Sequence, residues 1–160
     1  MRIGIPNEIL PGERRVAGTP DTVGLLIKMG FEVAVEAGAG ADADYTDAAF
    51  ADAGATIVGA TEELWSSADL IIKVNPPTET DGGGHELDAM KEGAVLVSLI
   101  QPGQNEALLE RANQKKISLI ALEQIPRISR AQKMDVLSSM ANIAGYRAVL
   151  EAAHVYGRFF

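Results

Sequence analysis

The chain has 160 residues, of which 47% are hydrophobic, and its formal net charge is -8 at pH 7. These values predict a folded chain with a core and one domain over residues 1–160 rather than two domains. The negative charge argues against a nucleic-acid surface and a polybasic membrane patch, because both need clustered cations. The absence of cysteine excludes disulfides, thiolate metal sites and a cysteine nucleophile, and we expect no metal site.

No segment of the sequence predicts a membrane span. The longest apolar runs, such as residues 94–97 and 69–74, are far shorter than the roughly 20 residues that a span requires. The N-terminus reaches Pro6 and Glu8 before an apolar run can build, unlike a signal peptide. We therefore expect a soluble chain without direct membrane insertion, which leaves open a place in a membrane assembly.

Strand-like and helix-like segments alternate along the chain. Residues 2–5 form an apolar run that Pro6 ends, and a helix follows in which Thr19 is the N-cap and Pro20 the first helical residue. Further strands are expected at residues 31–36, 56–59, 69–74, 94–100 and 117–122, and helices at residues 46–54, 61–68, 85–93 and 105–116. The alternation predicts a doubly wound, three-layer α/β domain with a mostly parallel sheet, ending in a long helix from Asp135 toward Phe160.

The segment GAGADA, residues 38–43, fits G-x-G-x-x-A and resembles a dinucleotide fingerprint. It follows the second expected strand instead of the first. Asp42, Asp44 and Asp47 lie where a pyrophosphate would sit, and like charges repel. A helix capped by Thr46 also begins too late for its N-terminus to hold phosphate. We prefer a flexible turn here, with ligand contact as the alternative.

Polar side chains follow several strands at the edge where open α/β sheets bind ligands. Arg14 and Arg15 come after the first strand, and Lys73 ends the fourth. They predict either an anion site or solvated cations, and we expect the charge of Lys73 to emerge at the sheet edge. Gln101 follows the strongest strand, where an amide can orient a ligand but cannot move protons as histidine can.

The two histidines offer little to catalysis. His85 lies in a Gly-rich loop and His154 in the C-terminal helix. Neither has Asp or Ser nearby in a triad-like pattern. We expect both to be structural or exposed.

The stretch PRISRAQKMDVLSSMANIAGYR, residues 126–147, has the highest density of ligand-binding groups. Arg127 and Arg130 can donate to carboxylate or phosphate, and Gln132 offers a donor and an acceptor that suit a carboxamide or ribose. Asp135 accepts from hydroxyls or an amide, or simply caps the helix. Small residues then allow another backbone to approach: Ala141, Ala144, Gly145 and Ala148. A ligand site and a capped helix at a tight interface both remain open on this chemistry.

The same stretch resembles the loop and helix that bind nucleotide in the alpha subunit of proton-translocating NAD(P) transhydrogenases. The opening RIGIPNEILPGERRVAGTP and the segments EAGAG, AGATIV and IIKVNPP are similar to the pattern that this subunit shares with alanine dehydrogenase. The resemblance covers essentially the whole chain. It implies an alanine dehydrogenase/transhydrogenase N-terminal-type domain, with a following NAD-binding Rossmann domain absent from this chain.

The resemblance also implies a site and partners. NAD(H) would lie in the cleft to the missing domain, with NADP(H) on a partner beta subunit, and hydride transfer would be coupled to proton translocation through a membrane domain. Gln132 and Asp135 would be the catalytic residues. The residues in contact with the cofactor would be Arg127, Ile128, Ser129, Gln132, Asp135 and Ser138. Homodimers, a peripheral location on the cytoplasmic side of the inner membrane, and an inactive isolated chain are also expected.

Two alternatives to the transhydrogenase remain. In alanine dehydrogenase, counterparts of Arg15 and Lys73 hold the keto acid, and a catalytic histidine occupies the position of Gln101. The chain has both cations but lacks that histidine, which argues against an amino-acid dehydrogenase. A non-catalytic assembly module, in which the small-residue helix is only an interface, is the other alternative.

Overall fold

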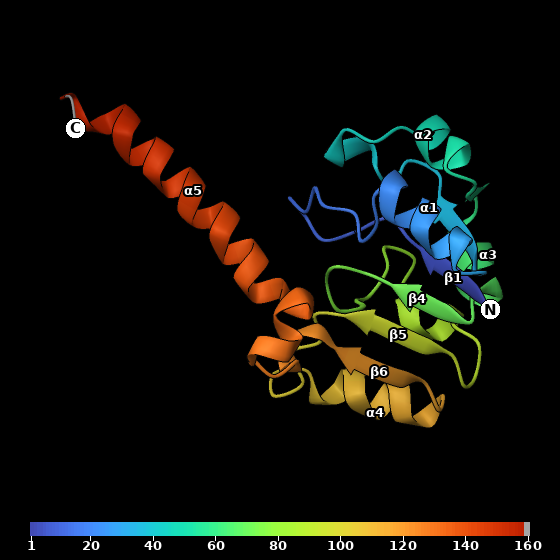
Figure 1. Ribbon diagram of the computed structural model, residues 1–160. Helices are drawn as coiled ribbons and strands as arrows, with labels where there is room; N and C mark the ends of the chain where they lie inside the picture. The colour runs from blue at the N-terminus through green and yellow to red at the C-terminus, as the bar shows by residue number, and fades with distance from the viewer. Residues whose placement is uncertain (159–160) are drawn as a thin grey trace. The chain divides into compact units, whose positions relative to one another are not determined.

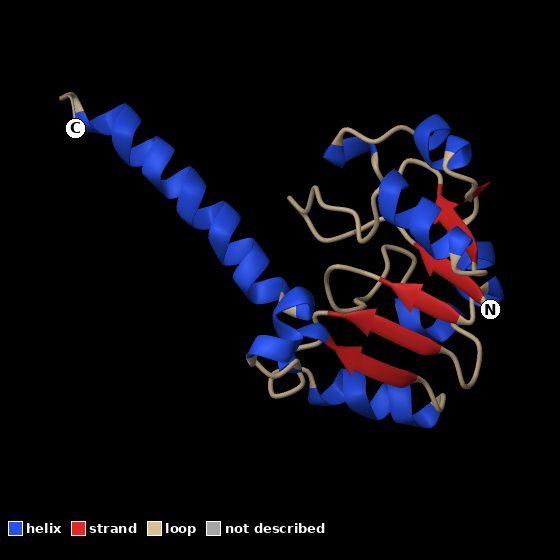
Figure 2. Cartoon of the chain, viewed as in Figure 1, coloured by secondary structure: helices blue, strands red, loops and turns tan. Residues whose placement is uncertain are grey.

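The computed structural model describes residues 1–158 (Figure 1). By their internal contacts, the residues form two compact units, Met1–Ala121 and Leu122–Phe160. The first unit contains the whole sheet, and the second contains short 3-10 turns and a long helix (Figure 2). We predicted one domain over residues 1–160. The division into two compact units does not test that prediction.

Six strands form one sheet in the order β3-β2-β1-β4-β5-β6, and every pairing is parallel. The strand order reverses direction between β1 and β4, which is the switch point where open α/β sheets form a crevice. Their bounds are β1 Arg2–Ile5, β2 Glu32–Glu36, β3 Thr56–Val58, β4 Leu70–Ile72, β5 Val95–Ser98 and β6 Ser118–Ala121.

The connections between the strands are short helices with local caps. They are α1 Pro20–Lys28, η1 Ala41–Ala43, α2 Asp47–Asp52, α3 Thr61–Ser67, η2 Glu86–Ala89 and α4 Glu106–Gln114. Thr19 caps α1 in a capping box with Thr22, and Thr46 accepts from the Ala49 N–H at the start of α2. These caps lie where the sequence predicts them, because a cap depends only on residues within one turn.

Two apolar clusters cover opposite faces of the sheet. Val33 and Val35 of β2 pack in one cluster with Val23 of α1 and Phe50 of α2. Between them along the strand, Ala34 packs in the other cluster, which includes residues of α3 and α4. This alternation follows from the two-residue period of a strand. It confirms the predicted doubly wound, three-layer α/β architecture.

The covering is incomplete at the β5–β6 end of the sheet. Leu96 is fully buried, whereas its neighbours Val95 and Val97 are only half-buried. Ile120 of β6 leaves 47% of its surface exposed. We expected apolar strands to be buried on both faces, and here one face of each of these two strands remains partly open.

The second unit consists of η3 Leu122–Gln124, η4 Ser129–Met134 and α5 Val136–Tyr156. The predicted start of the long helix at Asp135 is confirmed, since Asp135 is its N-cap. The helix ends at Tyr156, and Phe160 lies outside the described residues. No residue of α5 is buried. Its large exposed apolar side chains are Leu137, Met140, Ile143, Tyr146, Val149, Leu150, Val155 and Tyr156.

Candidate functional site

The second unit contains a polar hollow of about 360 Å³ at the start of α5. Its lining comes from the loop before η4, from η4 itself, and from the first turn of α5. The lining residues are Arg127, Ile128, Ser129, Gln132, Asp135 and Ser138. These are the same six residues that the resemblance predicts to contact the cofactor. The structure brings them together, while their role toward a cofactor stays a prediction.

Asp135 holds the hollow together through two neighbours, Ser138 and Arg127. Its Oδ1 accepts from the Ser138 N–H at 2.9 Å, and its Oδ2 accepts from the Ser138 hydroxyl at 2.6 Å. Arg127 donates from Nε to Asp135 Oδ2 at 3.4 Å and from Nη2 to Ser138 Oγ at 3.1 Å. The Ser138 hydroxyl and N–H, aided by Arg127, lower the pKa of the Asp135 carboxyl. Asp135 is therefore an ionised acceptor. It caps α5 and lines the hollow at the same time.

Gln132 is the exposed amide of this hollow. Its backbone carbonyl accepts from the Asp135 N–H at 3.3 Å. Within residues 1–158 its side-chain amide makes no hydrogen bond, so both its donor and acceptor face ligand or water. A carboxamide or a ribose hydroxyl can use such a pair. Because neither Gln132 nor ionised Asp135 is a strong acid or base, the hollow suits ligand orientation better than proton transfer.

The small-residue face of α5 is open to solvent. Ala141, Ala144 and Ala148 are exposed, and a Cβ added at Gly145 would meet no atom within 4 Å. Arg147 pairs with Glu151 one turn later on the same helix. This helix therefore leaves room for another backbone to approach closely, as predicted. Within residues 1–158, no other segment occupies that space.

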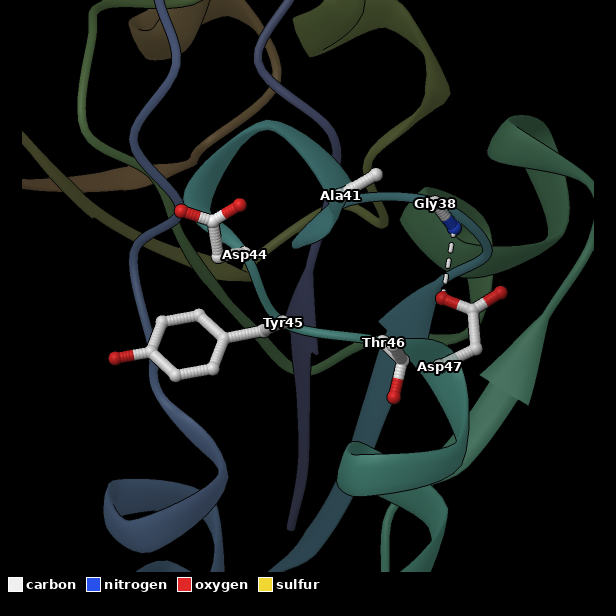
Figure 3. A pocket seen from close by; sticks show the side chains of 6 residues that line it. All are labelled: Gly38, Ala41, Asp44, Tyr45, Thr46 and Asp47. Atoms are coloured by element: carbon white, nitrogen blue, oxygen red, sulfur yellow. Dashed lines mark hydrogen bonds between the residues drawn. The ribbon is translucent and has the colours of Figure 1, made fainter.

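The GAGADA segment forms an ordered turn around a separate hollow of about 410 Å³ (Figure 3). The backbone N–H of Gly38 donates to Asp47 Oδ1 at 2.9 Å, so this chain already uses the first amide of the pattern. Asp44 also lines the hollow, and its left-handed backbone has φ 63°. Two carboxylates and an occupied amide oppose a phosphate group here. The geometry favours the turn over the ligand contact.

Lys73 does not reach solvent, and the prediction that its charge emerges at the sheet edge is wrong. Only 2% of its surface is exposed. Its Nζ donates to Glu86 Oε1 at 2.7 Å and lies 3.8 Å from Glu8 Oε2. The ammonium also sits 5.8 Å from the centre of the Trp65 ring. The side chain turns inward because two buried carboxylates and an aromatic face compensate its lost hydration.

Arg15 is held by Glu13 in a paired, forked contact. Nε and Nη2 of Arg15 lie 2.7 and 2.5 Å from the two carboxylate oxygens of Glu13. Glu13 also accepts from the side-chain amide of Asn75 at 2.8 Å. The Arg15 hydrogen bond lowers the pKa of Glu13 to about 2. Of the other predicted cations nearby, Arg14 stays exposed.

Three acidic residues near this edge were not predicted as site residues. Glu8, Glu13 and Glu86 supply the carboxylates around Lys73, Arg15 and Asn75. The sequence contains a signal for Glu8, which follows β1 by three positions and therefore lies at the same edge as Lys73. Glu86 has no such signal, because it reaches Lys73 from η2, the short 3-10 helix between β4 and β5.

Gln101 and His85 both have structural features that periodicity does not reveal. Gln101 has φ 51° in the left-handed region, and its carbonyl accepts from the Asn105 amide at 3.4 Å. His85 caps η2 by accepting the Leu87 N–H on Nδ1 at 3.1 Å. Burial lowers the pKa of His85, which agrees with its expected structural role. His154 lies exposed on α5.

No metal centre or membrane-spanning helix accompanies these sites in the described chain. Among residues 1–158, no group of three or more His, Asp or Glu side chains is arranged to hold a metal ion. Over the same residues, no helix is both long and apolar enough to cross a bilayer.

Comparison with known proteins places these features in a family. The chain is 53% identical to NAD(P) transhydrogenase subunit alpha of Haemophilus influenzae, covering 100% of this chain and 30% of that protein. It is 33% identical to alanine dehydrogenase of Mycobacterium tuberculosis, covering 96% of this chain and 40% of that protein. A crystal structure of transhydrogenase from Sinorhizobium meliloti matches with a TM-score of 0.88 and 39% identity, over 99% of this chain and 46% of that chain.

The shares covered show that the chain spans less than half the length of these relatives. The family described as alanine dehydrogenase/PNT, N-terminal domain, matches residues 4–144. That range includes strands β2 to β6, the last two residues of β1 and all six residues of the polar hollow. The chain therefore belongs to the alanine dehydrogenase/PNT N-terminal domain family.

Proposed function

We propose that the chain is part of the NAD(H)-binding alpha subunit of a proton-translocating NAD(P) transhydrogenase. The observation that carries this proposal is the hollow at the start of α5, lined by Arg127, Gln132, Asp135 and their neighbours. The similarity to NAD(P) transhydrogenase alpha subunits supports the assignment. The chain would supply one wall of the site, and a following Rossmann domain would supply the pyrophosphate cradle.

Each side chain of the hollow has a role that its chemistry supports. The exposed amide of Gln132 would pair with the carboxamide or ribose of the nicotinamide end of NAD(H). Asp135, ionised and fixed by Ser138, would accept from a ribose hydroxyl or an amide. Arg127 would keep Asp135 in place and offer its remaining donors to the ligand. Ile128 and Ser129 would complete the wall.

The reaction would be hydride transfer between NADH and NADP⁺. The nicotinamide carries the hydride chemistry, and the protein's contribution is to hold the donor and acceptor rings in direct apposition. NADP(H) would be bound by a partner beta subunit, and a membrane domain would couple the transfer to proton translocation. The alpha parts would form a homodimer on the cytoplasmic side of the inner membrane.

Replacing Gln132 with Asn in the complete enzyme tests this proposal. The shorter side chain keeps the amide but withdraws it by one methylene, so we expect hydride transfer to fall about 100-fold with little change in nucleotide affinity. Stopped-flow hydride transfer and equilibrium NADH binding would measure the two effects. Arg130→Lys is the matched control, because Arg130 does not line the hollow. Unchanged turnover in Gln132→Asn would favour a non-catalytic assembly module instead.

The sequence identities to the relatives argue against the alternative function, an amino-acid dehydrogenase. Alanine dehydrogenase is the more distant relative, at 33% against 53% identity. Arg15 and Lys73 are present, but their charges are already paired with Glu13 and Glu86. We expect no alanine-dependent NADH formation from the complete enzyme. Such activity would favour the dehydrogenase.

A further inference from the structure

Hydrogen-bond donors converge at the switch point of the sheet, immediately after β4. The backbone N–H groups of Val74 and Asn75 point to one place, and the side-chain amide of Asn75 joins them. The ammonium of Lys73 lies beside them. Convergent backbone amides next to a cation form a site for an anion. The crevice at a switch point is also where open α/β sheets bind ligands.

The carboxylate of Glu8 occupies this place. Its Oε1 accepts from the Val74 N–H at 2.6 Å. Its Oε2 accepts from the Asn75 N–H at 3.3 Å and from Asn75 Nδ2 at 3.2 Å. Only 2% of the Glu8 side chain is exposed. Glu8 is thus a buried anion, brought 66 positions along the chain to the donors it satisfies.

Charge pairing with Lys73 does not account for this arrangement. Lys73 has a closer partner in Glu86, at 2.7 Å against 3.8 Å for Glu8. Two of the three donors to Glu8 belong to the backbone, so their presence does not depend on which side chain residue 8 carries. Removing Glu8 would leave these half-buried N–H groups without their acceptor, which is costly. The donors therefore constitute a site in their own right.

We propose that Glu8 is a tethered ligand that fills a carboxylate site at the switch point and so closes it to free carboxylates. Glu8 is then a specificity-determining residue of the crevice between β1 and β4. Without its side chain, the site would take a small monocarboxylate. The atoms that Glu8→Ala removes beyond Cβ match acetate in size and charge. This inference concerns residues 8–75 and is independent of the nucleotide site proposed for residues 127–138.

Acetate binding to the 160-residue Glu8→Ala variant tests the proposal at pH 7. Backbone amide shifts would be followed by ¹⁵N NMR during titration with sodium acetate, with sodium chloride at equal ionic strength as the reference salt. We expect saturable shifts at Val74 and Asn75 in Glu8→Ala and none in the unmodified chain. Acetate at ten times its Kd should raise the Tm of the variant by about 3–6 °C.

Two controls separate a specific site from a general salt effect. Glu8→Gln keeps the volume of the side chain, so the site stays filled and acetate should have no effect. Glu36→Ala removes another carboxylate that accepts a backbone N–H, from Asn7 at 2.8 Å, but from a half-exposed position. Water reaches that N–H directly, so acetate should leave the stability of Glu36→Ala unchanged.

The outcomes decide the proposal in either case. Absence of saturable shifts in Glu8→Ala, or equal shifts in the unmodified chain, would overturn it. If Glu8→Ala does not fold in chloride, circular dichroism in acetate replaces the titration. Folding that depends on acetate supports the tethered-ligand role, and an unfolded chain in both salts refutes it.

Discussion

At the level of single residues, the partners and the burial of each carboxylate determine the direction in which its pKa shifts. Glu13 is held by Arg15 and Asn75, Glu86 by Lys73, and Asp135 by Ser138. Burial raises the pKa of Glu86 against the attraction of Lys73, while hydrogen bonds lower the pKa of Glu13 and Asp135. The same residue type therefore behaves differently according to its desolvation and its donors.

The Glu13–Arg15 pair should make the free energy of unfolding depend on pH in the acid range. The pKa of Glu13 falls from 4.5 to about 2 in the folded chain, so the ionised form stabilises the fold above pH 4.5. This stability should be lost as pH falls from 4.5 toward 2, because the unfolded chain then binds the proton first. Urea unfolding at a series of pH values would measure the loss. Glu13→Gln should flatten the curve over this range, and an equally steep curve would contradict the pairing.

Gly40 is required by packing and not by a ligand. A Cβ there would lie 2.6 Å from Phe50 Cε2 and 2.8 Å from the Tyr45 carbonyl oxygen. The carbonyl belongs to the backbone and cannot rotate away, so Gly40→Ala should destabilise the chain by about 1–3 kcal/mol in urea unfolding. Gly59→Ala is the matched control, since no atom lies within 4 Å of its Cβ position. Its stability should change by less than about 0.5 kcal/mol.

Helix ends are the clearest features at the level of elements. Thr46 caps α2 through the Ala49 N–H at 3.2 Å, whereas Ala60 begins α3 with no side-chain cap. Asp135 caps α5 and also forms part of the polar hollow. Asp135 is thus both the helix cap and the residue that we propose to contact the ligand at the start of α5, where helix N–H groups and a fixed carboxylate occur together.

The two helix starts predict opposite effects of substitution. Thr46→Ala removes the hydroxyl that accepts the Ala49 N–H at the start of α2. The substitution should therefore destabilise the chain by about 1 kcal/mol. Ala60→Ser adds an acceptor where the backbone is already extended, at φ -110° and ψ 119°, and should stabilise it by a few tenths of a kcal/mol to about 1 kcal/mol. Denaturant midpoints at constant m-value would show both changes. A loss of stability in Ala60→Ser would count against the capping argument.

The two compact units carry different kinds of polar site across the whole molecule. In Met1–Ala121 the charged groups at the switch point are buried and satisfy one another. In the unit that begins at Leu122, the polar hollow lies among exposed residues, with an unused amide at Gln132. We therefore infer that ligand binding belongs to the second unit and that the switch point of the first is closed.

An isolated chain with one wall of a site should bind nucleotide weakly. The polar hollow offers groups for the nicotinamide end, and we place the pyrophosphate cradle in a domain that follows. We expect the 160-residue chain to show no hydride transfer and to bind NADH with a Kd above the micromolar range. Titration of NADH fluorescence would measure this affinity, with Gln132→Asn as the comparison. Micromolar binding by the chain alone would show that the main determinants lie within it.

The exposed apolar surface of α5 predicts association. Eight large apolar side chains on one unburied helix exceed what a monomer normally exposes. We expect the chain to self-associate, in agreement with the proposed homodimer, and light scattering after size exclusion would measure its mass. Val149→Glu, in the middle of the helix at 61% exposure, should shift the mass toward the monomer. A monomeric unmodified chain at tens of micromolar would contradict the proposal.

The sequence by itself determined the strands, the helices and their caps, because periodicity and capping act within a few neighbouring residues. It also predicted that Arg127, Gln132 and Asp135 lie together, and they line one hollow because they fall within nine positions of each other around one helix start. Only the tertiary structure decided that Lys73 is buried and paired with carboxylates. Its partners Glu8 and Glu86 are 65 and 13 positions away. Burial and long-range pairing depend on how strands are ordered in the sheet, which no local pattern specifies.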